Sequence, residues 1–203
     1  MPIEIRTCID FLHTVEKLKC RTRHSFTTNG RQESVADHTC RLALMALLCA
    51  DNYPELDMNR VIRMCLVHDL GEAVTGDIPS FEKTDADERT EREAIADLLG
   101  ALPEPTRSDW QALFAEMEAR TTPEAKLWKA LDNMEAVLSH NEADLSTWIP
   151  LEYSLNLTYG EENAAFSPFT AALRQELRAD TERKLDAVSR RADADGCSDT
   201  GAT

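Results

Sequence analysis

Residues 68–79, His68-Asp69-Leu70-Gly71-Glu72-Ala73-Val74-Thr75-Gly76-Asp77-Ile78-Pro79, place one histidine and three carboxylates in a single short stretch of chain. Apolar residues at helical spacing precede this stretch, so it is expected to continue a helix. Burying that many carboxylates without a cation is costly, because each charge loses its hydration in a protein interior. The stretch therefore predicts a helical fold that is built around a charged site.

Two further potential metal ligands, His38 and Asp132, lie in other segments with helical spacing. Taken singly, a histidine on such a helix is more often a core residue, and an aspartate is more often exposed to solvent. Together with His68 and Asp69, however, they form a donor set of imidazole and carboxylate groups that suits one divalent ion such as Co, Mn, Mg, Fe or Zn. On a helix Glu72 would lie about one turn beyond the His-Asp pair, and it would face the same cavity.

Apolar residues recur at helical spacing along almost the whole chain, and alternating β-branched runs are absent, which predicts an all-α helical bundle. The expected helices cover 5–15, 34–52, 57–73, 85–99, a segment after Pro105, a segment opened by Thr122-Pro123, a weaker segment ending near Gly160, and a last helix from Ser167-Pro168. The basic segment 21–31 is expected to be a loop with a turn at Asn29-Gly30. Residues 1–191 should form a single domain, with a disordered tail over 192–203.

Composition restricts the possible partners. The chain has 203 residues and a net charge of −15, which should repel nucleic-acid polymers and anionic membrane surfaces. No apolar run approaches the roughly 20 residues of a membrane span, and the N-terminus lacks a secretory signal pattern, so a cytoplasmic protein is expected. The six cysteines contain no Cys-x-x-Cys pair and are interpreted as buried, reduced thiols, except for Cys197 in the expected tail.

Positive charge is concentrated in one segment of this acidic chain. Residues 17–31 carry a charge of +5, and the rest of the chain carries −20. The bases are Lys17, Lys19, Arg21, Arg23 and Arg31. A local cationic segment is typical of a site for a small anionic ligand. A solvated basic loop that balances acidic neighbours fits the charges equally well.

The order of these residues, a histidine, then a His-Asp pair, then an aspartate, resembles the HD-domain superfamily of metal-dependent phosphohydrolases, which fold as helical bundles. The resemblance covers Ile5 to about Ala143. The segments 33–38, 68–72 and 75–79 are similar to the branch that includes the bacterial 5′-deoxyribonucleotidases. This resemblance implies one divalent metal ion, a homodimer, and hydrolysis of (deoxy)nucleoside 5′-monophosphates to nucleoside and phosphate.

The same resemblance implies roles for further residues. Leu18-Lys19 followed by Arg23 matches the branch's phosphate-binding motif, and His24 stands where the best-known nucleotidases have tryptophan, so contacts to the base or sugar should differ. Lys83 and Lys129 fall where related sequences also have lysines and could neutralise phosphate, although ordinary exposed lysines fit as well. Glu72 and Asp77 are the expected catalytic carboxylates, one acting as base and the other serving the leaving alkoxide, in an order that the sequence does not assign.

Four other functions are open to chains with this pattern. A deoxynucleoside triphosphate triphosphohydrolase could use the same ion and arginine, and a non-catalytic nucleotide-binding module would have little use for Glu72 and Asp77. A di-iron oxygenase would need more histidines between Asp69 and Asp132, where the sequence has none. Hydrolases of guanosine tetraphosphate usually follow the glutamate with another acid, where this chain has Ala73.

Overall fold

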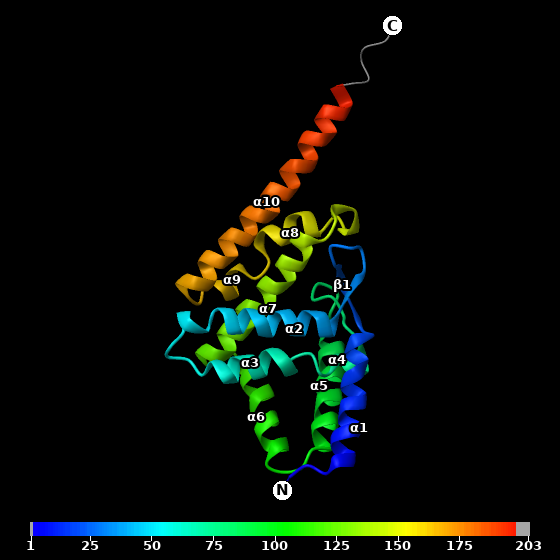
Figure 1. The fold of residues 1–203 in the computed structure, drawn as a ribbon, viewed down its shortest axis with the longest axis vertical. Helices are drawn as coiled ribbons and strands as arrows, with labels where there is room; N and C mark the ends of the chain where they lie inside the picture. The colour runs from blue at the N-terminus through cyan, green and yellow to red at the C-terminus, as the bar shows by residue number, and fades with distance from the viewer. Residues whose placement is uncertain (1, 198–203) are drawn as a thin grey trace.

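The computed structural model describes residues 2–197 and confirms an all-α architecture with one small sheet (Figure 1). Its α-helices are α1 (Ile5–Val15), α2 (Val35–Leu48), α3 (Met58–Val67), α4 (Glu72–Thr75), α5 (Asp85–Gly100), α6 (Thr106–Ala119), α7 (Pro123–Glu142), α8 (Glu152–Thr158), α9 (Glu161–Ala164) and α10 (Pro168–Cys197). Short 3₁₀ helices are η1 (Glu16–Lys19), η2 (Ala50–Asn52) and η3 (Leu145–Thr147), and the strands are β1 (Thr22–Phe26) and β2 (Gln32–Ser34).

Local hydrogen bonds explain where the main helices begin. The Ser34 hydroxyl accepts from the Asp37 backbone N–H, and the Asp37 carboxylate accepts from the Ser34 backbone, which is a capping box at the start of α2. The Thr122 hydroxyl caps α7 through the Ala125 N–H, and Pro123 occupies the first turn, where its missing N–H costs nothing. Both helix starts agree with the prediction, and they fix where α2 and α7 present their polar residues.

Helix α7 lies at the centre of the bundle, in contact with α2, α3, α6, α9, α10 and β1. Its residues Leu127, Leu131 and Met134 are fully buried, and burial of each such side chain contributes about 1.5–3 kcal/mol. Figure 1 shows α2 and α3 crossing α7, while α5 and α6 extend downward from the bundle. Because α7 contacts so many elements, polar residues on its inward face are held in fixed positions.

The basic segment 21–31 is not the loop expected from its sequence. Strands β1 and β2 pair antiparallel, with Thr22 opposite Ser34 and Phe26 opposite Gln32. The turn at Asn29-Gly30 was correctly located: Gly30 has a φ of +81°, which favours glycine, and the Asn29 side chain accepts from the Arg31 N–H. Strand β2 runs directly into α2, so the hairpin and that helix form one continuous unit.

The prediction that His68 and Asp69 lie within a helix running to residue 73 is also wrong. Helix α3 ends at Val67, a turn carries residues 68–71, and the short helix α4 begins at Glu72. The turn packs closely on α5, because a Cβ at Gly71 would lie 2.6 Å from Cγ of Glu91. A glycine is therefore required here for the turn to approach α5.

The C-terminal part of the chain differs in two ways from expectation. The segment expected to end near Gly160 consists of two short helices, α8 and α9, and α10 continues to Cys197, past the bundle (Figure 1). Residues 192–197 of the expected tail are thus helical, and 198–203 lie outside the described residues. Within the described residues, no helix is long and apolar enough to cross a membrane.

The cysteines are only partly as predicted. The five whose side chains are described are all free, and Cys49 and Cys65 are buried. Cys20 and Cys40, however, are exposed, which contradicts the expectation of buried thiols, and the side chain of Cys197 lies outside the described part.

Candidate functional site

Four side chains from three parts of the chain converge at one point. Nε2 of His38 lies 3.2 Å from Nε2 of His68 and 3.2 Å from Oδ1 of Asp132, and Nε2 of His68 lies 3.0 Å from Oδ2 of Asp69. The ligand atoms of His38, His68 and Asp69 all lie within 4.8 Å of one another. The structure thus brings together all four residues that the sequence nominates as metal ligands.

The outer nitrogen of each imidazole is held by the protein. Nδ1 of His68 donates to the backbone oxygen of Cys65 at 2.9 Å, and Nδ1 of His38 faces the carboxylate of Glu135 in a short contact. A proton on each Nδ1 leaves the Nε2 lone pair free to bind an ion, which is the arrangement found for histidine ligands of metals.

Glu135 is a site residue that the sequence did not reveal. Its side chain is fully buried on α7, one turn beyond Asp132. Besides His38 it accepts from Nε of Arg41 at 2.6 Å and from the Ser139 hydroxyl at 3.2 Å. Its spacing from Asp132 puts both on one face of α7, which is the signal that could have identified it.

A Glu135→Gln variant should bind a divalent ion about 10–100-fold more weakly, because the neutral amide orients and polarises His38 less well than a carboxylate. Calorimetric titration with Mn²⁺ would measure this change. Glu142→Gln is the matched control, since Glu142 also contacts Arg41 but is half-exposed and far from His38 in the network. Equal affinities of Glu135→Gln and wild type would exclude this role for Glu135.

The electrostatics of the cluster favour added positive charge. Burial lowers the pKa of His68, but the charges of Asp69 and Asp132 outweigh it and raise this pKa to about 10. Burial, followed by the charges of Asp69 and Asp77, raises the pKa of Glu72 to about 10. The Glu72 carboxyl is buried, and its Oε2 has no hydrogen-bond partner among the residues that the structure describes. Without an ion, the His68 imidazole and the Glu72 carboxyl therefore hold protons. Nearby ammonium and imidazole groups instead lower the pKa of Asp69 and Asp132 and keep both carboxylates ionised.

The donor set fits one divalent ion. The distances from Nε2 of His38 and of His68 to the carboxylates of Asp69 and Asp132 are 3.0–3.8 Å, which resemble the separations of neighbouring ligands around an ion whose bonds are about 2.1 Å long. Two imidazoles with two carboxylates leave coordination positions for water and substrate. The residues present therefore suit the implied metal.

His68, Asp69 and Asp132 line a cavity of about 860 Å³ whose wall also includes Arg23, Glu72 and Asp77, while His38 is fully buried. Nη1 of Arg23 is 3.9 Å from Oδ2 of Asp69, and its Nε is 3.6 Å from Oε2 of the buried Glu33. Burial, then the charge of Asp69 among others, raises the pKa of Asp77. The sequence-nominated arginine and both sequence-nominated carboxylates are thus beside the metal cluster.

The remaining nominated residues also line this cavity, but the two lysines are already paired. Lys129 donates to Oδ2 of Asp132 at 2.7 Å, and Lys83 forms an ion pair with Glu91 of α5. His24 lies 3.3 Å from the carboxylate of Glu152. Arg23 is the one lysine or arginine of the basic segment 17–31 that lines the cavity. Arg21 donates to the backbone oxygen of Val74 instead, and Arg31 pairs with Asp37.

Comparisons with known proteins agree with this geometry. The family described as HD domain matches residues 15–174. Human 5′-deoxynucleotidase HDDC2 is 36% identical over 141 residues, which are 68% of this chain and 68% of that protein. The 5′-deoxynucleotidase hdd1 of Schizosaccharomyces pombe is 33% identical over 159 residues, covering 69% of this chain and 79% of the relative.

Solved structures show the same fold. A crystal structure of a predicted metal-dependent phosphohydrolase from Magnetospirillum magnetotacticum superposes with a TM-score of 0.75 at 29% identity, covering 89% of this chain and 93% of that one. A conserved protein from Pyrococcus furiosus superposes with a TM-score of 0.67 at 26% identity, over 86% of this chain and 99% of that one. The arrangement of helices that carries the cluster is therefore shared with other proteins.

Proposed function

This chain belongs to the HD-domain family of phosphohydrolases, and from that premise we propose that it removes the 5′-phosphate from deoxynucleoside monophosphates. One observation carries the proposal: a metal-binding cluster, an arginine and two carboxylates line a single cavity. The relatives named 5′-deoxynucleotidases support the choice of substrate. Fold alone would not, because one fold serves many reactions.

Under this proposal His38, His68, Asp69 and Asp132 hold one divalent ion, whether Co, Mn, Mg, Fe or Zn. A bound ion supplies electrostatic activation of the phosphoryl group and of a water nucleophile. The hydrogen bonds at Nδ1 of His38 and His68 turn each Nε2 toward the carboxylates of Asp69 and Asp132, so the four groups already face one point.

Arg23 is positioned to bind phosphate oxygens. Its guanidinium is mostly buried between Glu33 and Asp69 and lines the cavity, so it can donate paired hydrogen bonds to an anion without leaving its place. Lys129 adds a second positive charge beside Asp132. Phosphoryl transfer concentrates charge on the non-bridging oxygens, so cations fixed in advance should lower the barrier.

Glu72 and Asp77 would handle the two protons of the reaction. One proton leaves the attacking water, and the other reaches the oxygen of the departing alkoxide. Both carboxyls line the cavity with Arg23, and both have a raised pKa, which lets either carboxyl hold a proton. Their positions in one wall support this division of labour.

Product analysis would test the function. Purified protein, freed of metal and then supplied with each of the five ions, should convert dAMP to deoxyadenosine and phosphate with at least one of them. Chromatography of dATP reactions is the control, because release of triphosphate would favour a triphosphohydrolase instead. Binding of dAMP without turnover under every ion would favour a non-catalytic nucleotide-binding module.

We also propose a homodimer. Leu44, Leu47 and Leu48 on α2 are 52–84% exposed, and Leu66 on α3 is 50% exposed. Leu44, Leu47 and Leu48 lie three and four residues apart, so they share one face of α2, which a second copy could cover. Light scattering of the purified protein would give its mass. The cytoplasmic location expected from the sequence stays a prediction.

A further inference from the structure

Unpartnered polar atoms collect in the wall of the same cavity, away from the metal cluster. Oε1 of Glu152, Nδ2 of Asn156 and Nε2 of His24 are all buried without a hydrogen-bond partner in the described part of the chain. Glu152 is 1% exposed and Asn156 is 3% exposed. A buried polar atom without a partner is costly, so an almost fully buried carboxylate and amide in one cavity wall, Glu152 and Asn156, indicate a missing ligand.

Glu152 and Asn156 act from one short helix. They are four residues apart on α8, so their side chains lie on the same face of the helix. The other carboxylate oxygen of Glu152 accepts from the Ile149 N–H at 2.8 Å, which fixes the carboxylate plane. The Asn156 backbone oxygen accepts from Arg174 of α10, which anchors the helix.

Two histidines approach Glu152 without satisfying it. Nε2 of His24 and Nε2 of His140 stand 3.3 and 3.4 Å from Oε1, longer than the roughly 2.9–3.0 Å of a good hydrogen bond. Burial, followed by the charges of His24 and Arg23, lowers the pKa of His140 to about 4, so His140 is neutral at pH 7. Burial also raises the pKa of Glu152, as expected for an acceptor that lacks a donor.

The position of this group suits the nucleoside half of a nucleotide. Asp132, Ala136 and His140 recur at every fourth residue of α7, and all three line the cavity. At 1.5 Å per residue, His140 lies about 12 Å along the helix from Asp132. That span is comparable to an extended nucleoside monophosphate measured from its phosphorus to its base. A phosphate at the metal cluster would thus bring the base toward Glu152.

The acceptor of Glu152 and the donor of Asn156 match the hydrogen-bonding groups on the Watson–Crick edge of a nucleobase. Every nucleobase presents an N–H donor beside an acceptor on its Watson–Crick edge, and enzymes read bases by hydrogen bonds to this edge. A carboxylate oxygen accepts from that N–H, and an amide can donate to the neighbouring acceptor. Phe81 packs edge-on against the His24 ring, with centroids 6.0 Å apart, and adds apolar surface in the same wall.

We propose that Glu152 and Asn156 form a subsite for the nucleobase, in which Glu152 accepts from a base N–H and Asn156 donates to the adjacent acceptor. The proposal rests on the nucleotidase function above and specifies how that site selects a substrate with a base. His24 follows Arg23 in the chain and has its Nε2 3.3 Å from Glu152, so it would lie beside the base.

The test compares substrates with and without a base. Glu152→Gln and Asn156→Ala should each lower kcat/KM for deoxynucleoside monophosphates about tenfold. Neither should change kcat/KM for 2-deoxyribose 5-phosphate, which has the sugar and phosphate but no base. Glu162→Gln is the matched control, because Glu162 is exposed on the neighbouring helix α9. Melting curves would verify folding, and loss of the unpartnered Asn156 amide should leave the fold intact.

Three outcomes would overturn the proposal. Unchanged kinetics of both variants on nucleotides would exclude the subsite. An equal loss on nucleotides and on 2-deoxyribose 5-phosphate would assign the group to a sugar hydroxyl or to folding. If the wild-type protein hydrolyses no nucleotide, the proposed function fails, but the subsite can still be tested by binding. Calorimetry would then measure the affinities of wild type and Glu152→Gln for dAMP and for 2-deoxyribose 5-phosphate. An equal effect of the substitution on both affinities would refute the subsite.

Discussion

An Asp69→Ala enzyme should bind divalent ions at least about a hundredfold more weakly than wild type and should have no measurable turnover. Loss of a partner outside the ligand shell already costs about 10–100-fold in affinity, and Asp69 contributes its own oxygen to the cluster. Its Oδ2 is 3.0 Å from Nε2 of His68 and within the group whose ligand atoms converge. Without that oxygen the ion loses both a ligand and a negative charge.

Two measurements would check this result. Trp128 packs edge-on against the His68 ring, with centroids 5.7 Å apart, so its fluorescence should report metal titrations. Metal should also raise the Tm of wild type, because an ion at 100 times its Kd stabilises the folded state by about 2.7 kcal/mol, and Asp69→Ala should lose most of this shift. Asp51→Ala, at an exposed aspartate, is the control. A metal-induced Tm shift equal to that of wild type in Asp69→Ala would exclude Asp69 as a ligand.

A Glu72→Ala enzyme should behave differently: it should keep its metal affinity within a few-fold and lose about 10²–10⁴ in kcat. Glu72 lines the cavity beside the cluster, but it takes no part in the short contacts that join His38 and His68 to Asp69 and Asp132. Its buried Oε2, which accepts no hydrogen bond from the described part of the chain, is available to exchange a proton with water or with the leaving group.

The contrast between the two variants is the decisive part of this experiment. Steady-state assays on dAMP at saturating metal give kcat, and calorimetry gives the metal affinity of the same preparations. Glu82→Ala, an exposed glutamate in the loop ten residues further on, controls for the loss of a carboxylate in this region. Near-normal turnover of Glu72→Ala would remove Glu72 from the proton transfers.

Helices with local start signals were predictable from sequence. Ser34 with Asp37 and Thr122 with Pro123 supply caps within a few residues, and the structure begins α2 and α7 at those positions. The hairpin was not predictable, because β1 is a short, polar strand without clear alternation and its partner β2 has three residues. Its pairing depends on contacts with α7, which no local pattern records.

The same distinction applies to the site. His38, His68, Asp69 and Asp132 were nominated from residue type and order, and the fold brings them together. Glu135 and Asn156 were missed, because a glutamate or asparagine on a helix usually faces solvent, whereas both are buried here. For Glu135 the spacing from Asp132 is the one sequence signal, and Asn156 has none. His140 could not be assigned a role from the sequence, because the side chains that it meets in the fold, His24 and Glu152, belong to other elements.

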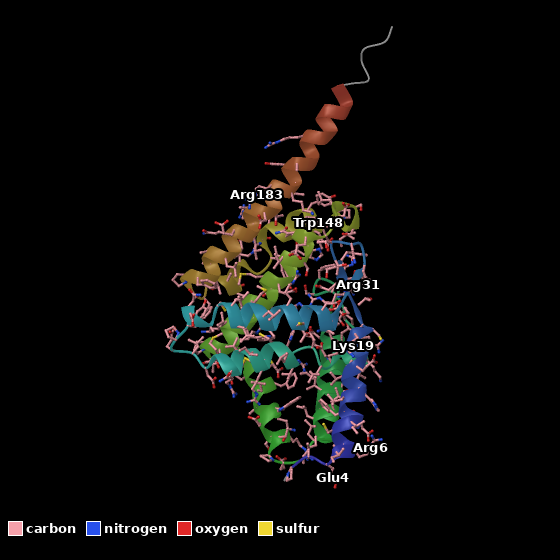
Figure 2. The ribbon with its side chains drawn as sticks, viewed as in Figure 1. Glu4, Arg6, Lys19, Arg31, Trp148 and Arg183 are labelled. Atoms are coloured by element: carbon pink, nitrogen blue, oxygen red, sulfur yellow. The ribbon has the colours of Figure 1, made fainter. Side chains whose placement is uncertain are left out.

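The hairpin found at residues 22–34 has a consequence for how this protein could diversify. Figure 2 labels Arg31, which directly follows the turn at the tip of the hairpin, well above Glu4 and Arg6 at the lower end of the molecule. Arg23 and His24 lie instead on the stretch of strand paired with the segment leading to His38. Under the proposed function, changes of length at residues 27–30 would therefore leave Arg23 in place for the phosphate. A substitution at position 24 would instead alter the cavity wall next to Arg23, which makes this position a first target for engineering the substrate range.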